Sequence, residues 1–272
     1  MSLWVTIVLA AILGGASAGA LGVWVTGLRM PFLAVFTAHA ALAGAAFGPW
    51  LGLDTTTAGF AGALVGATLL ALLLRHRDLD PNAALGSLFS LMLGVAFLGI
   101  GLAPEGQKAG VLQLLWGNLL LVSPAHVVRM AVAAGALAAF AVLLNKELKI
   151  LLYSRALAAA SIPARRLLAG LLILAAFVIT VNLEAVGGLL LYSLIVNPAV
   201  AALRFARSYP AALAGGAGLG ALSALGGFGA AWILNWPVGA CIVLASSSLV
   251  ALAALAARQP DSRATSPPRS PA

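Results

Sequence analysis

The lysines and arginines of this chain are sorted into alternate gaps between long apolar stretches. They gather in every second gap, at 29, 75–77, 146–166, 204–207 and in the tail from 258. The gaps between these hold only Lys108, and Arg129 lies just inside an apolar stretch. A soluble protein has no reason to sort charge in this way, but the cytoplasmic loops of polytopic membrane proteins retain Lys and Arg during insertion. The pattern predicts a multi-pass membrane protein with its N-terminus outside and its C-terminus in the cytoplasm.

The composition supports the same class of protein. Only 8% of the residues are charged and 62% are hydrophobic, with a mean hydropathy of +1.09, whereas soluble domains carry roughly 25% charged residues. The net charge of +8 does not indicate a nucleic-acid partner, because the basic residues flank apolar spans and are not interleaved with aromatic ones. The single cysteine, Cys241, excludes a disulfide framework.

The chain is predicted to be an all-α integral membrane protein with about nine helices. Each span needs about 20 apolar residues to cross a hydrocarbon core of about 30 Å. The expected spans are 3–26, 32–52, 55–74, 84–102, 126–145, 167–184, 187–203, 211–232 and 238–257. They form one polytopic membrane domain over 1–257. The remaining 258–272 segment is rich in Ser, Pro and Arg and is expected to be a disordered cytoplasmic tail.

Three gaps between the spans stand out. The longest inside segment is 146–166, and its alanine-rich run at 155–160 favours a helix. The longest outside segment is 103–125. The turn at 184–188 is too short for a loop, so the two spans that it joins must pack together or break within the bilayer. Irregular backbone at that depth survives only when protein buries it or when it lines a cavity.

The sequence holds no signature of an enzyme or of a bound cofactor. None of the three lysines stands in a glycine-rich phosphate-binding loop, so the chain cannot hydrolyse a nucleotide by itself. A zinc-protease motif, a serine nucleophile elbow and a clustered pair of acids are also missing.

Polar residues inside the membrane are the default functional hypothesis, because burying them in hydrocarbon is costly. The set is small: His39, Asn118, Arg129, Asn182, Glu184 and Asn197. His39 is either bonded to a backbone carbonyl in a packed bundle or a ligand in a translocation path. Glu184 is either an interfacial carboxylate or an acceptor at the outer mouth of a cation pathway. Arg129 is expected to extend to the interface, and Asn197, before Pro198, marks a kinked helix with a polar lining.

Six stretches in the same order resemble the permease subunits of ABC-type zinc, manganese and iron importers. The most specific are LEAVGGLL at 183–190 and NPAVAAL at 197–203. The others lie at 29–44, 84–90, 116–123 and 236–240. The family has an Asp and a His four residues apart in its second span; His39 stands at the His position, but Val35 replaces the Asp.

The resemblance implies the type II ABC importer permease fold and a place in the bacterial inner or plasma membrane. Two copies would enclose a path for zinc, manganese or iron, with His39 and Glu184 as tentative metal contacts and Asn197 as lining. ATP would be bound by cytoplasmic ATPase subunits that dock on 146–166, and an extracytoplasmic solute-binding protein would deliver the cargo. The residues also leave open a permease for a non-metal cargo, an ion-coupled secondary transporter and a structural membrane subunit.

Overall fold

The computed structural model describes residues 2–74, 80–117 and 119–256, and every regular element within them is a helix. The predicted tail and Asn118 lie outside the described residues. Nine long helices stand where nine spans were predicted, which confirms the fold class. Eight are long and apolar enough to cross a membrane, and α10 carries a shorter apolar stretch. Their bounds are α1 Leu3–Gly27, α2 Leu33–Leu51, α3 Thr55–Leu73, α4 Pro81–Leu102, α6 Pro124–Leu143, α9 Ala164–Val186, α10 Gly188–Phe205, α11 Tyr209–Leu234 and α12 Val238–Ala256.

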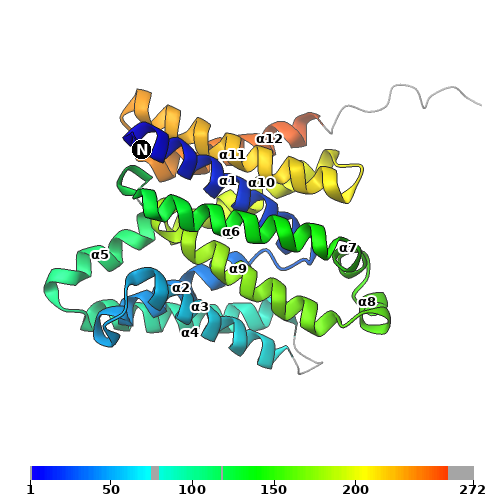
Figure 1. Ribbon diagram of the computed structural model, residues 1–272, viewed down its shortest axis with the longest axis horizontal. Coiled ribbons are helices and arrows are strands. Elements are labelled where there is room, and N and C mark those ends of the chain that lie inside the picture. The colour runs from blue at the N-terminus through cyan, green and yellow to red at the C-terminus, as the bar shows by residue number, and fades with distance from the viewer. Residues whose placement is uncertain (1, 75–79, 118, 257–272) are drawn as a thin grey trace, which may run out of the picture.

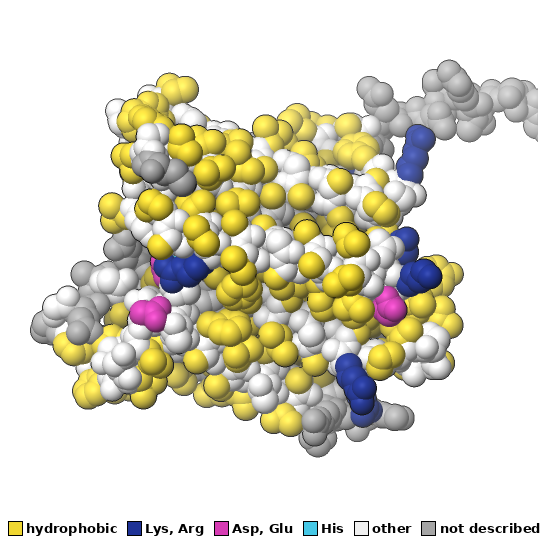
Figure 2. Space-filling model, viewed as in Figure 1, with side chains coloured by type: hydrophobic (Ala, Val, Ile, Leu, Met, Phe, Trp, Pro, Cys, Tyr) yellow, Lys and Arg dark blue, Asp and Glu magenta, His cyan; other side chains and the backbone are white. Residues whose placement is uncertain are grey.

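The helices form a bundle with two distinct ends (Figure 1). One end, called here the α5 end, holds the start of α1, helix α5 (Glu105–Trp116) and the 3-10 turn Leu119–Leu121. The opposite end, the α7 end, holds α7 (Asn145–Tyr153) and α8 (Arg155–Ser161). On the face seen in Figure 2, charged side chains gather at these ends and hydrophobic ones cover the middle.

Two pairs of glycines bring α1 and α11 into backbone contact. A Cβ atom built on Gly15 would lie 2.3 Å from the carbonyl oxygen of Gly220, and one on Gly19 would lie 2.1 Å from that of Gly216. No side chain fits at such distances. Small residues allow membrane helices to pack this closely because the gain comes from van der Waals contact and not from hydrophobic burial.

A single residue joins α9 to α10. Gly187 has a φ of 89°, which favours glycine, and its N–H donates to the carbonyl oxygen of Leu183 at 2.9 Å. Gly117, at the end of α5, packs on this joint so closely that an added Cβ atom would lie 2.2 Å from the carbonyl carbon of Val186. The joint is therefore buried in protein, which is one of the two arrangements that the short turn left open.

Candidate functional site

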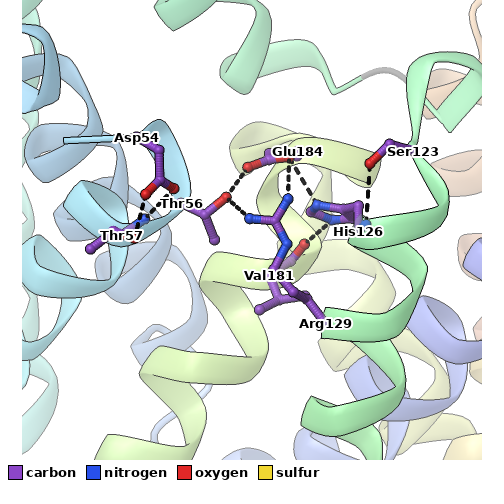
Figure 3. A network of polar contacts seen from close by, with 8 residues as sticks. All are labelled: Asp54, Thr56, Thr57, Ser123, His126, Arg129, Val181 and Glu184. Carbon is purple, nitrogen blue, oxygen red and sulfur yellow. Dashed lines mark hydrogen bonds and ion pairs between the residues drawn. The ribbon is translucent and has the colours of Figure 1, made fainter.

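Three helices bring four polar side chains together at the α5 end (Figure 3). This Glu184 cluster consists of Thr56 on α3, His126 and Arg129 on α6, and Glu184 on α9. His126 Nδ1 lies 2.9 Å from Glu184 Oε2, and Arg129 Nη2 lies 4.0 Å from the same oxygen. The Thr56 hydroxyl donates to Glu184 Oε1 and accepts from Arg129 Nη1 at 2.6 Å.

Helix starts position these side chains. The Ser123 side chain caps α6 by accepting from the His126 N–H at 3.2 Å, and Pro124 occupies the first helical turn. His126 and Arg129 are three residues apart and so share one face of α6. Asp54 caps α3 through the Thr57 N–H at 3.0 Å, which sets Thr56 in the first turn of that helix. Hydrogen bonds from Thr57 hold the pKa of the exposed Asp54 carboxyl below its ordinary value.

Contacts at both ring nitrogens fix the orientation of the His126 side chain. His126 Nε2 is 2.7 Å from the Val181 carbonyl oxygen, and a carbonyl only accepts, so Nε2 carries a hydrogen. The other ring nitrogen, Nδ1, then contacts a carboxylate oxygen of Glu184. The ring therefore lies between the Val181 carbonyl on one side and the Glu184 carboxylate on the other.

Glu184 also borders a cavity. The cavity has a volume of about 250 Å³, and the Glu184 side chain is 29% exposed. Its lining comes from α3, α5, the segment before α6, and α9: Thr55, Gly110, Leu114, Leu121, Val122, Ser123 and Glu184. A carboxylate at such a place can accept a hydrated cation from solution. Among the described residues, no group of three or more His, Cys, Asp or Glu side chains could hold a metal ion.

His39 lies apart from this cluster, within α2. Its side chain is buried at 4% exposure, Nδ1 lies 2.8 Å from the Val35 carbonyl oxygen, and its ring meets that of Phe89 edge to face at 4.9 Å. Nδ1 must donate to that carbonyl, so in the neutral ring Nε2 carries the lone pair. The backbone bond is the geometry expected of a packed histidine, and it also leaves one nitrogen able to act as a ligand.

Asn197 occupies a third place, in the middle of α10. Its Nδ2 donates to the hydroxyls of Ser246 and Ser247 on α12, each at 3.1 Å. Within the described residues, no hydrogen bond or ion pair joins any two of His39, Glu184 and Asn197. The structure distributes these residues along the bundle and does not gather them in one site.

Sequence reasoning overlooked two members of the Glu184 cluster, Thr56 and His126. The expected span began at residue 126, so His126 was placed at its edge and not inside the membrane. The available signal was the pair Ser123-Pro124, which starts a helix and directs residues 126 and 129 to one face. Arg129, expected only to extend to the interface, is bonded to Thr56 although its side chain is 41% exposed. Asn182 is fully buried and ties α9 to α1 by donating to the Ser17 hydroxyl at 3.2 Å.

Comparison with known proteins places these features in context. The model of the ABC 3 transport family matches residues 2–257. The manganese import system permease protein ScaB of Streptococcus parasanguinis is 26% identical over 86% of this chain and 83% of its own length. The high-affinity zinc uptake system membrane protein ZnuB of Haemophilus influenzae is 24% identical over 85% of this chain and 89% of its own length.

Solved structures show the same fold. PsaBC from Streptococcus pneumoniae, in complex with Fab, superposes with a TM-score of 0.82 at 23% identity, over 93% of this chain and 91% of that chain. A putative metal-chelate type ABC transporter in an inward-facing conformation gives a TM-score of 0.74 at 16% identity, over 93% and 85% of the two chains.

Proposed function

Because the chain belongs to the ABC 3 transport family, whose model spans residues 2–257, we propose that it is the permease subunit of an ABC importer for a divalent metal cation. Manganese and zinc are the cargoes in the names of its relatives, and iron is kept as a third candidate. The observation that carries the cation is the half-buried Glu184 carboxylate, which borders a cavity at one end of a nine-helix membrane bundle. Two copies of the chain would enclose the path.

The α5 end is proposed to face outside, where a solute-binding protein would deliver the cargo. The charge sorting supports this orientation, because the 146–166 segment, which holds five of the lysines and arginines, forms α7 and α8 at the α7 end. Exposed tryptophans support a membrane boundary near the α5 end, since Trp side chains favour the membrane interface. They are Trp4, Trp50, Trp232 and Trp236.

Orientation can be tested by single-cysteine labelling in a Cys241→Ala background. Tyr153 at the α7 end is 86% exposed and Leu121 at the α5 end is 69% exposed. An impermeant thiol reagent added to intact cells should label Leu121→Cys and leave Tyr153→Cys unlabelled until the cells are opened. The reverse result would invert the topology.

ATP hydrolysis is assigned to a separate cytoplasmic subunit that docks on 146–166. This segment folds as α7 and α8, and it exposes the apolar side chains of Tyr153 and Leu157, the latter at 48%. Apolar side chains exposed beside the membrane are suited to a protein partner.

Contacts at the α7 end suit a transmission of force from that partner to the spans. Lys149 Nζ on α7 lies 5.8 Å from the centre of the Tyr209 ring on α11. The Tyr209 hydroxyl accepts from Nε1 of Trp24, which is fully buried in α1. A movement of α7 would therefore reach two long helices directly.

Docking is tested by Ala158→Pro. Ala158 is buried in α8, and its N–H donates to the Ser154 carbonyl oxygen at 2.9 Å. Proline removes this donor at a cost of about 3 kcal/mol, so transport should be lost while the protein remains in the membrane. A proline at Ala159 would also disrupt this short helix, so it cannot serve as a control. The control is Ala159→Ser, a small change at the neighbouring exposed position. Co-purification of a normally stimulated ATPase with Ala158→Pro would contradict the docking site.

The cargo is tested by radiometal uptake with the partner proteins present, in a strain without other importers. Uptake of manganese, zinc or iron that depends on ATP is expected. If none of the three metals is taken up while a different solute is, the metal cargo fails and the permease assignment stands.

A further inference from the structure

A group of polar side chains lies between α10 and α12, away from the Glu184 cluster. Asn197 uses both amide hydrogens on the Ser246 and Ser247 hydroxyls. Ser246 in turn donates to the Val243 carbonyl oxygen at 2.9 Å. Ser193 stands one turn before Asn197 and is partly exposed. These four residues, Ser193, Asn197, Ser246 and Ser247, are called the α10–α12 oxygen face.

The oxygen face lies at mid-membrane depth. Asn197 is nine residues after the start of α10, and Ser247 is nine residues after the start of α12. At 1.5 Å per residue both are about 13.5 Å along their helices, and the hydrocarbon core is about 30 Å thick. Both helices begin within a few residues of the α5 end, because α10 follows the Gly187 joint and α12 follows the turn at Trp236.

The oxygen face is also open to the surroundings of a single copy. Ser247 is exposed and Ser193 and Asn197 are partly exposed, while Ser246 is fully buried behind them. The corresponding depth of α6 instead exposes apolar side chains such as Val132 at 56%. The Asn197 amide hydrogens and the Ser246 hydroxyl already have protein partners. Exposed amide and hydroxyl oxygens can still accept further hydrogen bonds, which water supplies and lipid tails do not. The oxygen face is therefore better suited to contact with water, whereas the exposed apolar side chains of α6 are better suited to contact with lipid.

The chemistry of the oxygen face sets what can pass it. Its ligands are neutral amide and hydroxyl oxygens, which bind divalent cations weakly compared with carboxylates, imidazoles and thiolates. Such a set does not offset the loss of an ion's hydration shell, but it can hydrogen-bond to the water molecules of that shell.

We propose that the α10–α12 oxygen face lines a water-filled stretch of the pathway, which the cation crosses with its water shell in place. The inference rests on the proposed importer function for its cargo, but the presence of water at this face is a separate claim with its own test.

The test is cysteine accessibility in the complete transporter in native membranes. Ser247→Cys, in a Cys241→Ala background, should react with a small, positively charged, water-soluble methanethiosulfonate reagent. The matched control is Val132→Cys on α6, nearly the same number of residues from the start of its helix and expected to face lipid. We expect Ser247→Cys to react at least about tenfold faster than Val132→Cys, because the reaction needs a hydrated thiolate.

Equal rates at the two positions would overturn the proposal. Oxidative cross-linking of Ser247→Cys between two copies, with no labelling, would overturn it too, because the face would then be a dry contact between copies. Ser193→Cys provides a second reading on α10 and should follow Ser247→Cys.

A transport measurement addresses the hydrated ion. Asn197→Leu removes the amide at nearly constant volume and should lower metal uptake several-fold, while Asn197→Ser, which keeps an oxygen, should retain most of it. Equal loss in both variants would contradict a role for the oxygen atoms. Rapid labelling of Ser247→Cys without any metal uptake would support the water-filled face and count against the metal cargo, so the two failures can be told apart.

Discussion

The Glu184 cluster and the middle of the bundle differ in the kind of polar side chains that they contain. At the α5 end, the Glu184 carboxylate on α9 is shared by an arginine and a histidine from α6 and a threonine from α3. In the middle, His39 and Asn197 are neutral groups, bonded to a carbonyl of their own helix or to neighbouring hydroxyls. A charge at the bilayer centre costs at least about 2.5 kcal/mol, so the carboxylate lies at the end of the bundle and the middle holds uncharged amides and hydroxyls. In the importer proposed above, this contrast would mean capture at the end and loose passage through the middle.

The largest expected effect on transport is the loss caused by removing Glu184 from the α5 end. Glu184→Ala leaves Arg129 and His126 without their shared acceptor, and uptake should fall by more than about tenfold, equivalent to about 1.4 kcal/mol. Glu184→Gln is the matched variant: it keeps an acceptor for Thr56 but loses the charge, and it should be nearly as inactive. Radiometal uptake, normalised to the amount of protein in the membrane, measures both. Full activity in Glu184→Gln would place capture elsewhere.

A carboxylate added to the middle of the bundle should give that region the kind of strong cation ligand that Glu184 provides at the α5 end. Val35→Asp puts an acid one helical turn before His39 and restores an i, i+4 ligand pair. Cation binding by the purified transporter should tighten about tenfold, while uptake slows because release becomes limiting. Titration calorimetry and uptake measure the two effects, and Val35→Asn separates charge from shape. Faster uptake in Val35→Asp would show that the middle is limited by capture.

Removing the imidazole itself should have a smaller effect. His39→Ala should lower uptake a few-fold, because a single neutral ligand contributes only transient contact to a mostly hydrated ion. Phe89→Leu is the control, since it removes the ring packed on His39 and leaves the imidazole in place. Unchanged uptake in His39→Ala would contradict a cation contact, and an equal loss in Phe89→Leu would make the histidine a packing residue.

The smallest effect is expected at Asp54, which borders the cluster without joining it. Asp54→Ala removes the cap of α3 and should lower stability by about 1 kcal/mol. The pKa of Asp54 is lowered by Thr57, so its contribution is complete above the ordinary value of 3.8 and is lost only as the pH falls through the lowered folded value. Thermal unfolding in detergent should therefore show the same difference from the unmodified protein at pH 7 and pH 5. A difference that shrinks at pH 5 would contradict this assignment.

The sequence predicted the bundle better than the site, for a physical reason. A span must satisfy its own backbone hydrogen bonds in lipid, so its signal is local and all nine could be placed to within a few residues. The joint at Gly187 was equally local. Helix α5 was missed because a short segment with Glu105 and Lys108 carries no span signal.

The Glu184 cluster depends on contacts between distant parts of the chain. The Thr56–Glu184 contact joins residues 128 apart, and no local pattern encodes such a meeting. Glu184 could be selected because a carboxylate near a span is rare, whereas Thr56 and His126 are ordinary residues at the starts of helices. Rarity identified two members, Glu184 and Arg129, and only the fold brought them together with Thr56 and His126.

The glycine contact between α1 and α11 has a consequence for biosynthesis. Gly15 and Gly19 must meet Gly216 and Gly220, which the ribosome adds about 200 residues later. At roughly 5–20 residues per second, the first helix waits on the order of 10–40 s for its partner. Until then this surface must be covered by lipid, by other membrane proteins or by other parts of the same chain. The earliest helix to enter the bilayer thus meets its glycine partner late, and this contact closes only when the C-terminal third of the chain arrives.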